Sequence, residues 1–270
     1  MLDQCKSALA RFLVRYLTRK ARKNEPFSVN SSDSLASVLQ LADVVLVEGN
    51  QRFSTAVKYL TQSTWSHAAL YVGRVTIPGE RQGDTPALIE ADLRNGVITV
   101  PLSKYEGFNT RICRPIGLGS AARQRVAQFM FDSLGMNYDL KNVVDLARYL
   151  IPTPPVPNRF RRKMLALGSG DPTRAICSSR IAQAFQAVGY PILPRVEQFT
   201  KKECEHCRET IHEILHIRHH TLFTPRDFDV SPYFAVIKPT IEKGFEYQAL
   251  TWSEEHAANT ELADRNVVKA

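Results

Sequence analysis

Residues 66–73 read Ser-His-Ala-Ala-Leu-Tyr-Val-Gly, an apolar run that opens on a histidine and ends on a glycine. A run of four to eight apolar residues bounded by turn-forming residues is typical of a buried β-strand. His67 is the polar exception at its start, and an imidazole can serve there as a general base or as a hydrogen-bonded structural group. The sequence around this strand decides between the two.

Further short apolar runs lie on both sides of this strand and predict a sheet. Asn95-Gly96 between two of them is a strong hairpin signal, because both residues tolerate positive φ. The predicted strands are Val44–Val47, Ala68–Val72 closed by Gly73, Ala87–Ala91, Val97–Val100, Arg111–Arg114 and Phe234–Lys238.

Helical spacing of apolar residues dominates the middle of the chain. The predicted helices are Phe53–Leu60, Ala121–Leu134, Leu140–Leu150 and Cys177–Val188. In the last of these, Ile181, Ala184, Phe185 and Val188 form one apolar stripe, and Gly189 marks its end. Strands grouped before helices predict an α+β fold, with an antiparallel sheet packed against helices.

Composition shifts divide the chain into three predicted regions. Residues 1–33 form a basic amphipathic arm with a polar linker, 34–240 a catalytic domain, and 241–270 a polar C-terminal tail. Within the domain, residues 151–172 are rich in proline and basic residues, which favours an exposed loop. Residues 195–222 are read as an insertion rich in cysteine and histidine.

The formal charge of +8 comes mainly from the arm. Residues 1–24 carry seven basic side chains and one acidic one, whereas the remaining 246 residues carry 28 basic and 26 acidic ones. A basic amphipathic helix can lie on an anionic membrane or dock on its own domain with a solvated basic face. A nucleic-acid-binding arm ranks last, because no aromatic residues of the kind that stack on bases accompany the charges.

The cysteine pattern favours a reducing compartment. Five cysteines at irregular spacing do not form the even, regular framework of a stapled secreted domain. Basic residues interrupt the N-terminal stretch where a cleavable signal would need a continuous apolar segment. No apolar run approaches the roughly 18 residues that span a membrane. We therefore expect a cytoplasmic protein, with peripheral membrane contact left open; its oligomeric state is not predicted.

Three polar residues in apolar surroundings suggest thiol chemistry. Cys177 opens a predicted helix, where the helix N-terminus lowers a thiol pKa and offers backbone N–H groups to an oxyanion. His67 could take the proton of the thiol, and Glu90, the one charge in the strand 87–91, could orient the imidazole. Each residue also has an ordinary structural explanation: a buried apolar cysteine, a strand histidine and a solvated glutamate.

The order of these motifs resembles the circularly permuted NlpC/P60 superfamily, in its YiiX/YebB-like branch, related to lecithin:retinol acyltransferase-like proteins. The resemblance covers residues 40–190. Its motifs are Ala42-Asp43-Val44-Val45-Leu46 with Ala42 in place of the usual Gly, Ser66-His67-x-x-x-Tyr71-Val72-Gly73, Ile89-Glu90-Ala91 before Gly96-Val97, Gly135-x-x-Tyr138-Asp139, and Cys177-Ser178-Ser179-x-Ile181.

The resemblance implies a permuted papain-like fold and a Cys177–His67–Glu90 triad, with Ser66, Tyr138 and Ser178 lining the substrate pocket. It implies attack on an amide or ester through a thioester intermediate, in a hydrolase or an acyltransferase. The resemblance does not identify the substrate, which we expect to be a lipid or a cell-envelope-type acyl or peptide compound. The alternative is a non-catalytic adaptor of the same fold on a membrane surface or a lipid.

A cluster of metal-binding residue types remains. Cys204-x-x-Cys207 precedes His212 and His216, and these four side chains could ligate zinc, although the short Cys–His gap matches no common zinc finger. If this stretch is helical, several of them share one face, which equally suits a solvated polar surface. No cofactor is therefore expected, and zinc is the lower-ranked alternative.

Overall fold

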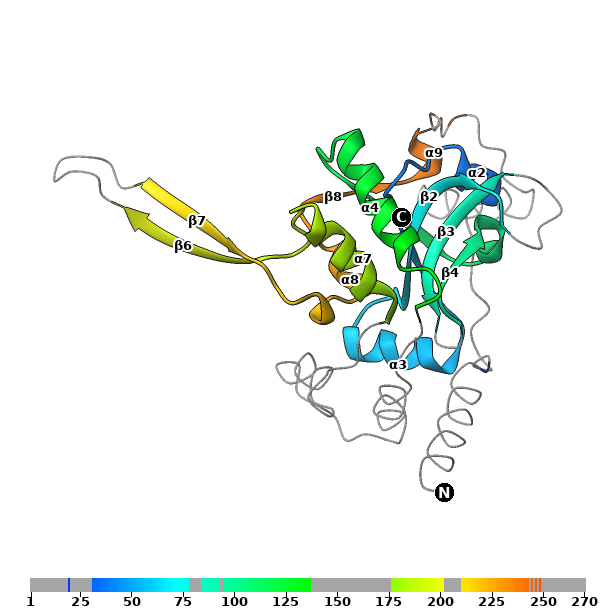
Figure 1. Cartoon of the computed structure of the whole chain (residues 1–270), viewed down its shortest axis with the longest axis horizontal. Helices are drawn as coiled ribbons and strands as arrows, with labels where there is room; N and C mark the ends of the chain where they lie inside the picture. The colour runs from blue at the N-terminus through cyan, green and yellow to red at the C-terminus, as the bar shows by residue number, and fades with distance from the viewer. Residues whose placement is uncertain are drawn as a thin grey trace, which may run out of the picture. The chain divides into compact units, whose positions relative to one another are not determined.

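The computed structural model describes residues 19, 31–77, 84–92, 95–136, 176–201, 210–242, 244, 246 and 248 (Figure 1). In chain order its elements are α2 (Ser32–Ala36), β1 (Val44–Val47), α3 (Arg52–Thr61), β2 (His67–Val75), β3 (Thr85–Asp92), β4 (Gly96–Pro101), η1 (Leu102–Tyr105), β5 (Thr110–Pro115), α4 (Ser120–Asp132), α7 (Ile176–Ala187), β6 (Arg195–Lys201), β7 (Thr210–His216), η3 (His220–Leu222), α8 (Pro225–Asp229), β8 (Phe234–Ile237) and α9 (Pro239–Glu242).

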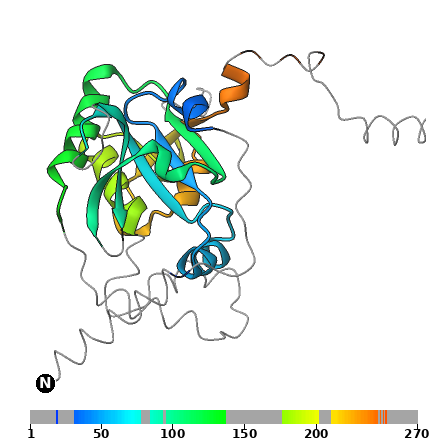
Figure 2. The same ribbon diagram turned by 90° about the vertical axis from the view of Figure 1, so that its right-hand side faces the viewer.

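Six of these strands form one antiparallel sheet in the order β4-β3-β2-β1-β5-β8. Helices α4 and α7 contact each other and lie against one face of it (Figure 2). In α7, Ile181, Ala184 and Phe185 are fully buried, as their spacing predicted. Complete burial of one large apolar side chain stabilises the fold by about 1.5–3 kcal/mol. The predicted α+β architecture is confirmed.

Both faces of β1 are buried, which explains its uninterrupted apolar sequence. Val44 and Leu46 pack in the core under α4 and α7, while Val45 and Val47 pack in a second cluster on the opposite face. That second cluster includes Leu35 of α2 and Tyr105 of η1. Side chains alternate along a strand, so a strand covered on both sides has no position left for a polar residue.

The entry to β1 is fixed by backbone conformation and a buried charge. Ala42, which stands where the resembling family has glycine, adopts a φ of +68°. This left-handed region is costly for a residue with a Cβ, which explains the usual glycine. Asp43 is fully buried and accepts hydrogen bonds from the Arg114 guanidinium at 2.8–3.2 Å, which ties the start of β1 to β5.

Two sequence expectations need correction. Gly73 does not end β2, which continues to Val75 with a shift of register between Tyr71 and Arg74. The φ of Gly73 is +90°, a conformation that lets the strand bend and continue. Residues 195–201 and 210–216 are not helical but form the antiparallel hairpin β6–β7, separate from the main sheet. The shared helix face considered for the Cys/His cluster is therefore wrong.

Several predictions fall outside the described residues. These are the arm apart from Arg19, the helix 140–150, the loop 151–172 and most of the tail. The chain divides into two compact units, Met1–Pro239 and Thr240–Ala270, and every element up to β8 belongs to the first. The predicted domain boundaries stay predictions. Across the described part of the chain, no helix has both the length and the apolar character required to cross a membrane.

Candidate active site

His67 and Glu90 are brought together by strand register. Glu90 in β3 lies opposite Ala69 in β2, and His67 precedes Ala69 by two residues, on the same face of the sheet. Such diagonal neighbours are within reach of long side chains. The His67 Nε2–H donates to Glu90 Oε2 at 3.1 Å, because a carboxylate can only accept. Glu90 is only 1% exposed.

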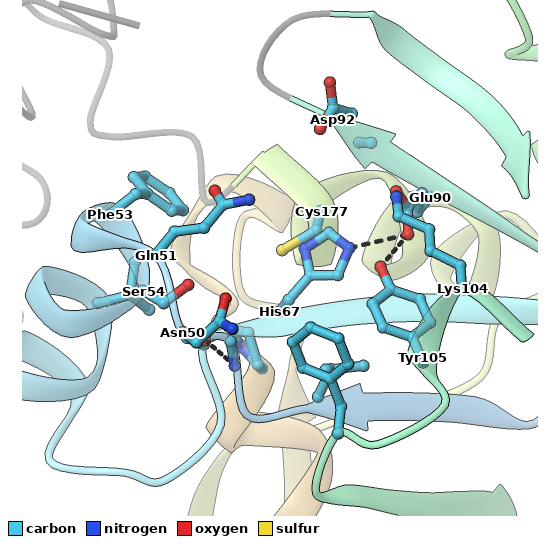
Figure 3. A pocket seen from close by; sticks show the side chains of 17 residues that line it. Asn50, Gln51, Phe53, Ser54, His67, Glu90, Asp92, Lys104, Tyr105 and Cys177 are labelled. Carbon is cyan, nitrogen blue, oxygen red and sulfur yellow. Dashed lines mark hydrogen bonds and ion pairs between the residues drawn. The ribbon is translucent and has the colours of Figure 1, made fainter. Parts of the chain in front are cut away.

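Cys177 reaches the imidazole from the first turn of α7. It is the second residue of that helix, and its side chain is 5% exposed. Its sulfur lies beside the His67 ring, which is bonded to Glu90 on its other side (Figure 3). Because Nε2 is committed to Glu90, Nδ1 is the nitrogen that faces the thiol. The structure thus brings together all three residues of the predicted triad.

The charges of these groups stabilise one another. Burial opposes ionisation of Cys177, but the His67 ring and the backbone N–H groups of Ala68 and Ser178 outweigh it and lower the pKa of the thiol. Burial likewise opposes the imidazolium, but the Cys177 thiolate and Glu90 raise the pKa of His67 to about 10. The arrangement favours a thiolate–imidazolium pair, which is the reactive form of such a dyad.

Two partners of Glu90 were not expected from the sequence. The Lys104 Nζ forms an ion pair with Glu90 Oε1, and the Tyr105 hydroxyl donates to Glu90 Oε2. Both residues belong to η1, directly after β4. Burial raises the pKa of Glu90, but His67 and Lys104 override this and lower it to about 2. A Lys-Tyr pair in a short polar turn carries no pattern that sets it apart, so sequence alone could not assign it.

The three residues open into a cavity of about 150 Å³. Its apolar wall comes from several elements and is made of Val47, Phe53, Val57, Ala91, Phe108 and Pro225. Its polar lining includes Asn50, Gln51, Ser54, Ser66 and Asp92. Figure 3 shows the side-chain amide of Gln51 pointing toward Cys177. Gln51 precedes α3, and its side chain makes no capping hydrogen bond to that helix.

A close backbone approach shapes this cavity near Ser66. The Gly49 N–H donates to the Ser66 hydroxyl at 2.9 Å, and both residues line the cavity. A Cβ on Gly49 would lie 2.9 Å from that hydroxyl and closer still to Ser54. Only glycine fits this position without displacing the cavity wall. The structure therefore places Ser66 at the pocket, where the resemblance put it.

The other predicted pocket residues are placed differently. The Ser178 hydroxyl is buried and donates to the Phe223 carbonyl at 2.8 Å, so its side chain ties α7 to η3 and does not line the cavity. Only its backbone N–H reaches the thiol. Tyr138 lies outside the described residues.

The Cys/His cluster is described only in part. Cys204, Cys207 and the side chain of His212 lie outside the described residues. The His216 Nε2 bonds to Glu197 at 2.9 Å across the exposed β6–β7 hairpin. Within the described ranges, no group of three or more His, Cys, Asp or Glu side chains is arranged to hold a metal ion. A zinc site on Cys204, Cys207, His212 and His216 stays a prediction.

Comparison with known proteins agrees with this geometry. Residues 39–149 match the family described as permuted papain-like amidase enzyme, YaeF/YiiX, C92 family. The match includes His67, Glu90 and both η1 partners of Glu90, and it ends before Cys177. It supports the YiiX branch and the permuted papain-like fold predicted from the motifs. The family match does not test the relation to the wider NlpC/P60 superfamily or to the lecithin:retinol acyltransferase-like proteins. That relation stays a prediction.

A solved structure is similar at low identity. It is entitled crystal structure of metalloprotein yiiX from Escherichia coli O157:H7. The two chains share 16% sequence identity with a TM-score of 0.44, over 74% of this chain and 96% of that one. No curated protein matches the sequence.

Proposed function

We propose that the protein is a cysteine-dependent hydrolase that cleaves an amide or ester bond through a thioester on Cys177. The observation that carries this proposal is the contact chain from the Cys177 thiol through His67 to the buried Glu90 carboxylate, at the wall of a cavity. The match to an amidase family supports the same reaction class.

The reaction follows from these contacts. His67 takes the thiol proton, and the Cys177 thiolate attacks the substrate carbonyl carbon to give a tetrahedral oxyanion. The first backbone N–H groups of α7 lack partners within the helix and can donate to that oxyanion, as can the Gln51 amide. The imidazolium then protonates the leaving amine or alcohol as the thioester forms.

A second half-reaction frees the enzyme. Water attacks the thioester with His67 as base, which releases the acid and restores the thiol. An amine or alcohol in place of water would make the protein an acyltransferase. Glu90 keeps the His67 ring oriented throughout and stabilises its charged form.

The cavity indicates the character of the acyl group. Its apolar wall suits a hydrocarbon acyl moiety, and its volume of about 150 Å³ is small. We infer that the enclosed part of the substrate is a short apolar acyl segment. A lipid and an acylated peptide both contain such a segment.

Acyl-enzyme trapping tests the proposal. Incubation with p-nitrophenyl hexanoate should add one hexanoyl group to the peptide that contains Cys177, and neutral hydroxylamine should remove it. Cys177→Ala should lose this adduct, and His67→Ala should form it far more slowly. Cys113→Ala is the matched control, because Cys113 is fully buried and burial raises the pKa of its thiol. Acylation that persists in Cys177→Ala would contradict the proposal, and wild-type protein that neither forms the adduct nor releases hexanoate faster than Cys177→Ala would favour the adaptor.

A further inference from the structure

We propose that Lys104 and Tyr105 are positioning residues that clamp Glu90, so that its carboxylate stays ionised and directs His67 toward Cys177. This proposal rests on the proposed cysteine chemistry and extends it to a second layer of side chains. Neither residue belongs to the predicted triad, and neither needs to touch the reacting atoms in order to act.

The contacts around Glu90 account for both of its oxygens. Oε1 is bonded to Lys104, while Oε2 accepts from both His67 and Tyr105. A buried carboxylate is costly unless its lone pairs are filled, and here donors from β2 and η1 fill them. Glu90 is only 1% exposed, so the loss of a donor leaves its carboxylate with little access to bulk water.

The clamp is rigid because its parts also pack. Tyr105 is buried in the cluster beneath the sheet, and its ring lies 6.0 Å from the His67 ring and 5.9 Å from Phe108. The Lys104 Nζ lies 5.4 Å from the centre of the Tyr105 ring. A carboxylate held in this way cannot rotate away from His67, which fixes the imidazole with Nδ1 toward the thiol.

The charge of Lys104 has a second consequence. The titratable groups that contact Glu90 are His67 from β2 and Lys104 and Tyr105 from η1, and Tyr105 is also influenced by Cys177 from α7 and Asp92 at the end of β3. Lys104 is the one permanent cation among these described groups. Its removal makes the site more negative, which disfavours the Cys177 thiolate and favours the imidazolium.

The test is the pH dependence of Cys177 alkylation by iodoacetamide, read on the Cys177 peptide by mass spectrometry. In the Lys104→Met protein we expect the pH at which the thiolate forms to rise by about half a unit to one unit, since the Lys104 side chain is 39% exposed and its charge is partly screened. Lys104→Arg should retain the wild-type profile. Met keeps the apolar stem of lysine, so the comparison isolates the charge.

A loss of structure alone gives a different result. Unfolding exposes the Cys177 thiol, speeds its alkylation, moves the midpoint to the ordinary thiol value of about 8.5 and changes the circular dichroism, whereas the clamp predicts a displacement of about half a unit to one unit in a protein with wild-type circular dichroism. Tyr105→Phe removes only one hydroxyl and should displace the midpoint in the same direction by a smaller amount. It also provides the test if Lys104→Met does not fold.

The outcomes separate this proposal from the proposed function. A wild-type midpoint at the ordinary thiol value of about 8.5 would overturn the cysteine chemistry itself. A depressed wild-type midpoint that neither Lys104→Met nor Tyr105→Phe displaces would overturn the clamp alone. Equal displacement in Lys104→Met and Lys104→Arg would show that charge is not the cause.

Discussion

Glu90 is a carboxylate in a position where the strand pattern calls for an apolar side chain. It lies between Ile89 and Ala91, both buried in the core on the other face of the sheet. Three donors make this arrangement tolerable, and one of them is the catalytic base candidate. A buried ion pair contributes little to the stability of a fold, because a well-packed apolar pair often stabilises it equally well. The retention of Glu90 is easier to explain if the charge acts on His67.

Replacing Glu90 with glutamine should make the site less negative, which is the opposite of the effect expected for Lys104→Met. Glu90 raises the pKa of His67, so without this anion the imidazolium is lost at a lower pH and the alkaline limb of activity moves down from about 10. The uncharged amide also orients the ring less firmly, and we expect kcat/KM to fall by about 100-fold or more. The pH profile of p-nitrophenyl hexanoate hydrolysis measures both effects.

The Asp92→Asn variant controls for a general loss of negative charge at the cavity. Asp92 lines the same cavity, and its carboxylate accepts hydrogen bonds from Asn95 in the β3–β4 turn. An alkaline limb that moves equally in Glu90→Gln and Asp92→Asn would contradict a specific role of Glu90.

Sequence patterns made the three triad residues candidates and the family resemblance joined them, but neither indicated the residues that support Glu90. The sequence alone shows three polar residues in apolar surroundings, namely His67, Glu90 and Cys177. Lys104 and Tyr105 lie in a turn where polar residues are ordinary, so their role depends on a register that only the folded sheet reveals. Ser178 was predicted to line the substrate pocket, but the helix turns its hydroxyl toward the Phe223 carbonyl.

Among the elements, α3 decides what the cavity admits. Phe53, Ser54 and Val57 line the cavity from the first turns of this helix. Their spacing places them on one face, with Val57 four residues after Phe53. The carbonyl of Arg19, from the basic arm, accepts from the Arg52 N–H at 3.0 Å and fills one of the free donors at the start of this helix.

Enlarging Val57 should therefore shorten the acyl group that the enzyme accepts. In Val57→Phe we expect kcat/KM for p-nitrophenyl hexanoate to fall by about 10- to 100-fold, because the added ring occupies the space of several methylene groups. Hydrolysis of p-nitrophenyl acetate should change by less than about threefold. Thr55→Ala, at an exposed position of α3 outside the cavity, should leave the ratio of the two esters unchanged. An equal loss for both esters in Val57→Phe would place the acyl group elsewhere.

The elements were predictable where burial was complete on at least one face. The sequences of the main-sheet strands are short apolar runs, and the sequence of α7 places its apolar residues on one face of the helix. The sequences of β6 and β7 show no such run, because they contain charged residues and histidines, and the two cysteines between them made the stretch compatible with a metal site. Two strands alone bury too little to impose a strict alternation of apolar and polar residues.

At the scale of the whole molecule, charge is distributed unevenly. The described domain surrounds its acidic groups with partners, as Glu48 with Lys58 at 3.1 Å and Asp229 with Arg111 at 2.5 Å show. The excess lies in residues 1–24, whose sequence predicts an amphipathic helix. The contact between Arg19 and Arg52 links this arm to α3, one of the elements that line the cavity. A membrane-bound arm would therefore bring the cavity to a lipid surface.

Vesicle binding tests this expectation. Changing all seven basic residues of the arm to glutamine should reduce binding to vesicles that contain about 30% phosphatidylserine by at least about 100-fold, at about 1 kcal/mol for each basic residue near the surface. The substitutions are Lys6, Arg11, Arg15, Arg19, Lys20, Arg22 and Lys23 to Gln, and the Arg19 backbone carbonyl remains able to contact α3. Binding to neutral phosphatidylcholine vesicles should be weak for both proteins, because the electrostatic attraction is absent.

Substitutions of exposed basic residues outside the arm serve as the control for the loss of charge alone. Arg125, Arg195 and Lys238 are exposed and lie outside the arm, so their change to glutamine should leave vesicle binding within about threefold of wild type. A loss per charge as large as that in the arm variant would show that the arm has no special role. Salt-sensitive binding to duplex DNA together with no vesicle binding would identify the anionic partner as nucleic acid. Binding that needs both the arm and anionic lipid would place the protein at an anionic membrane surface, as the arm sequence predicts.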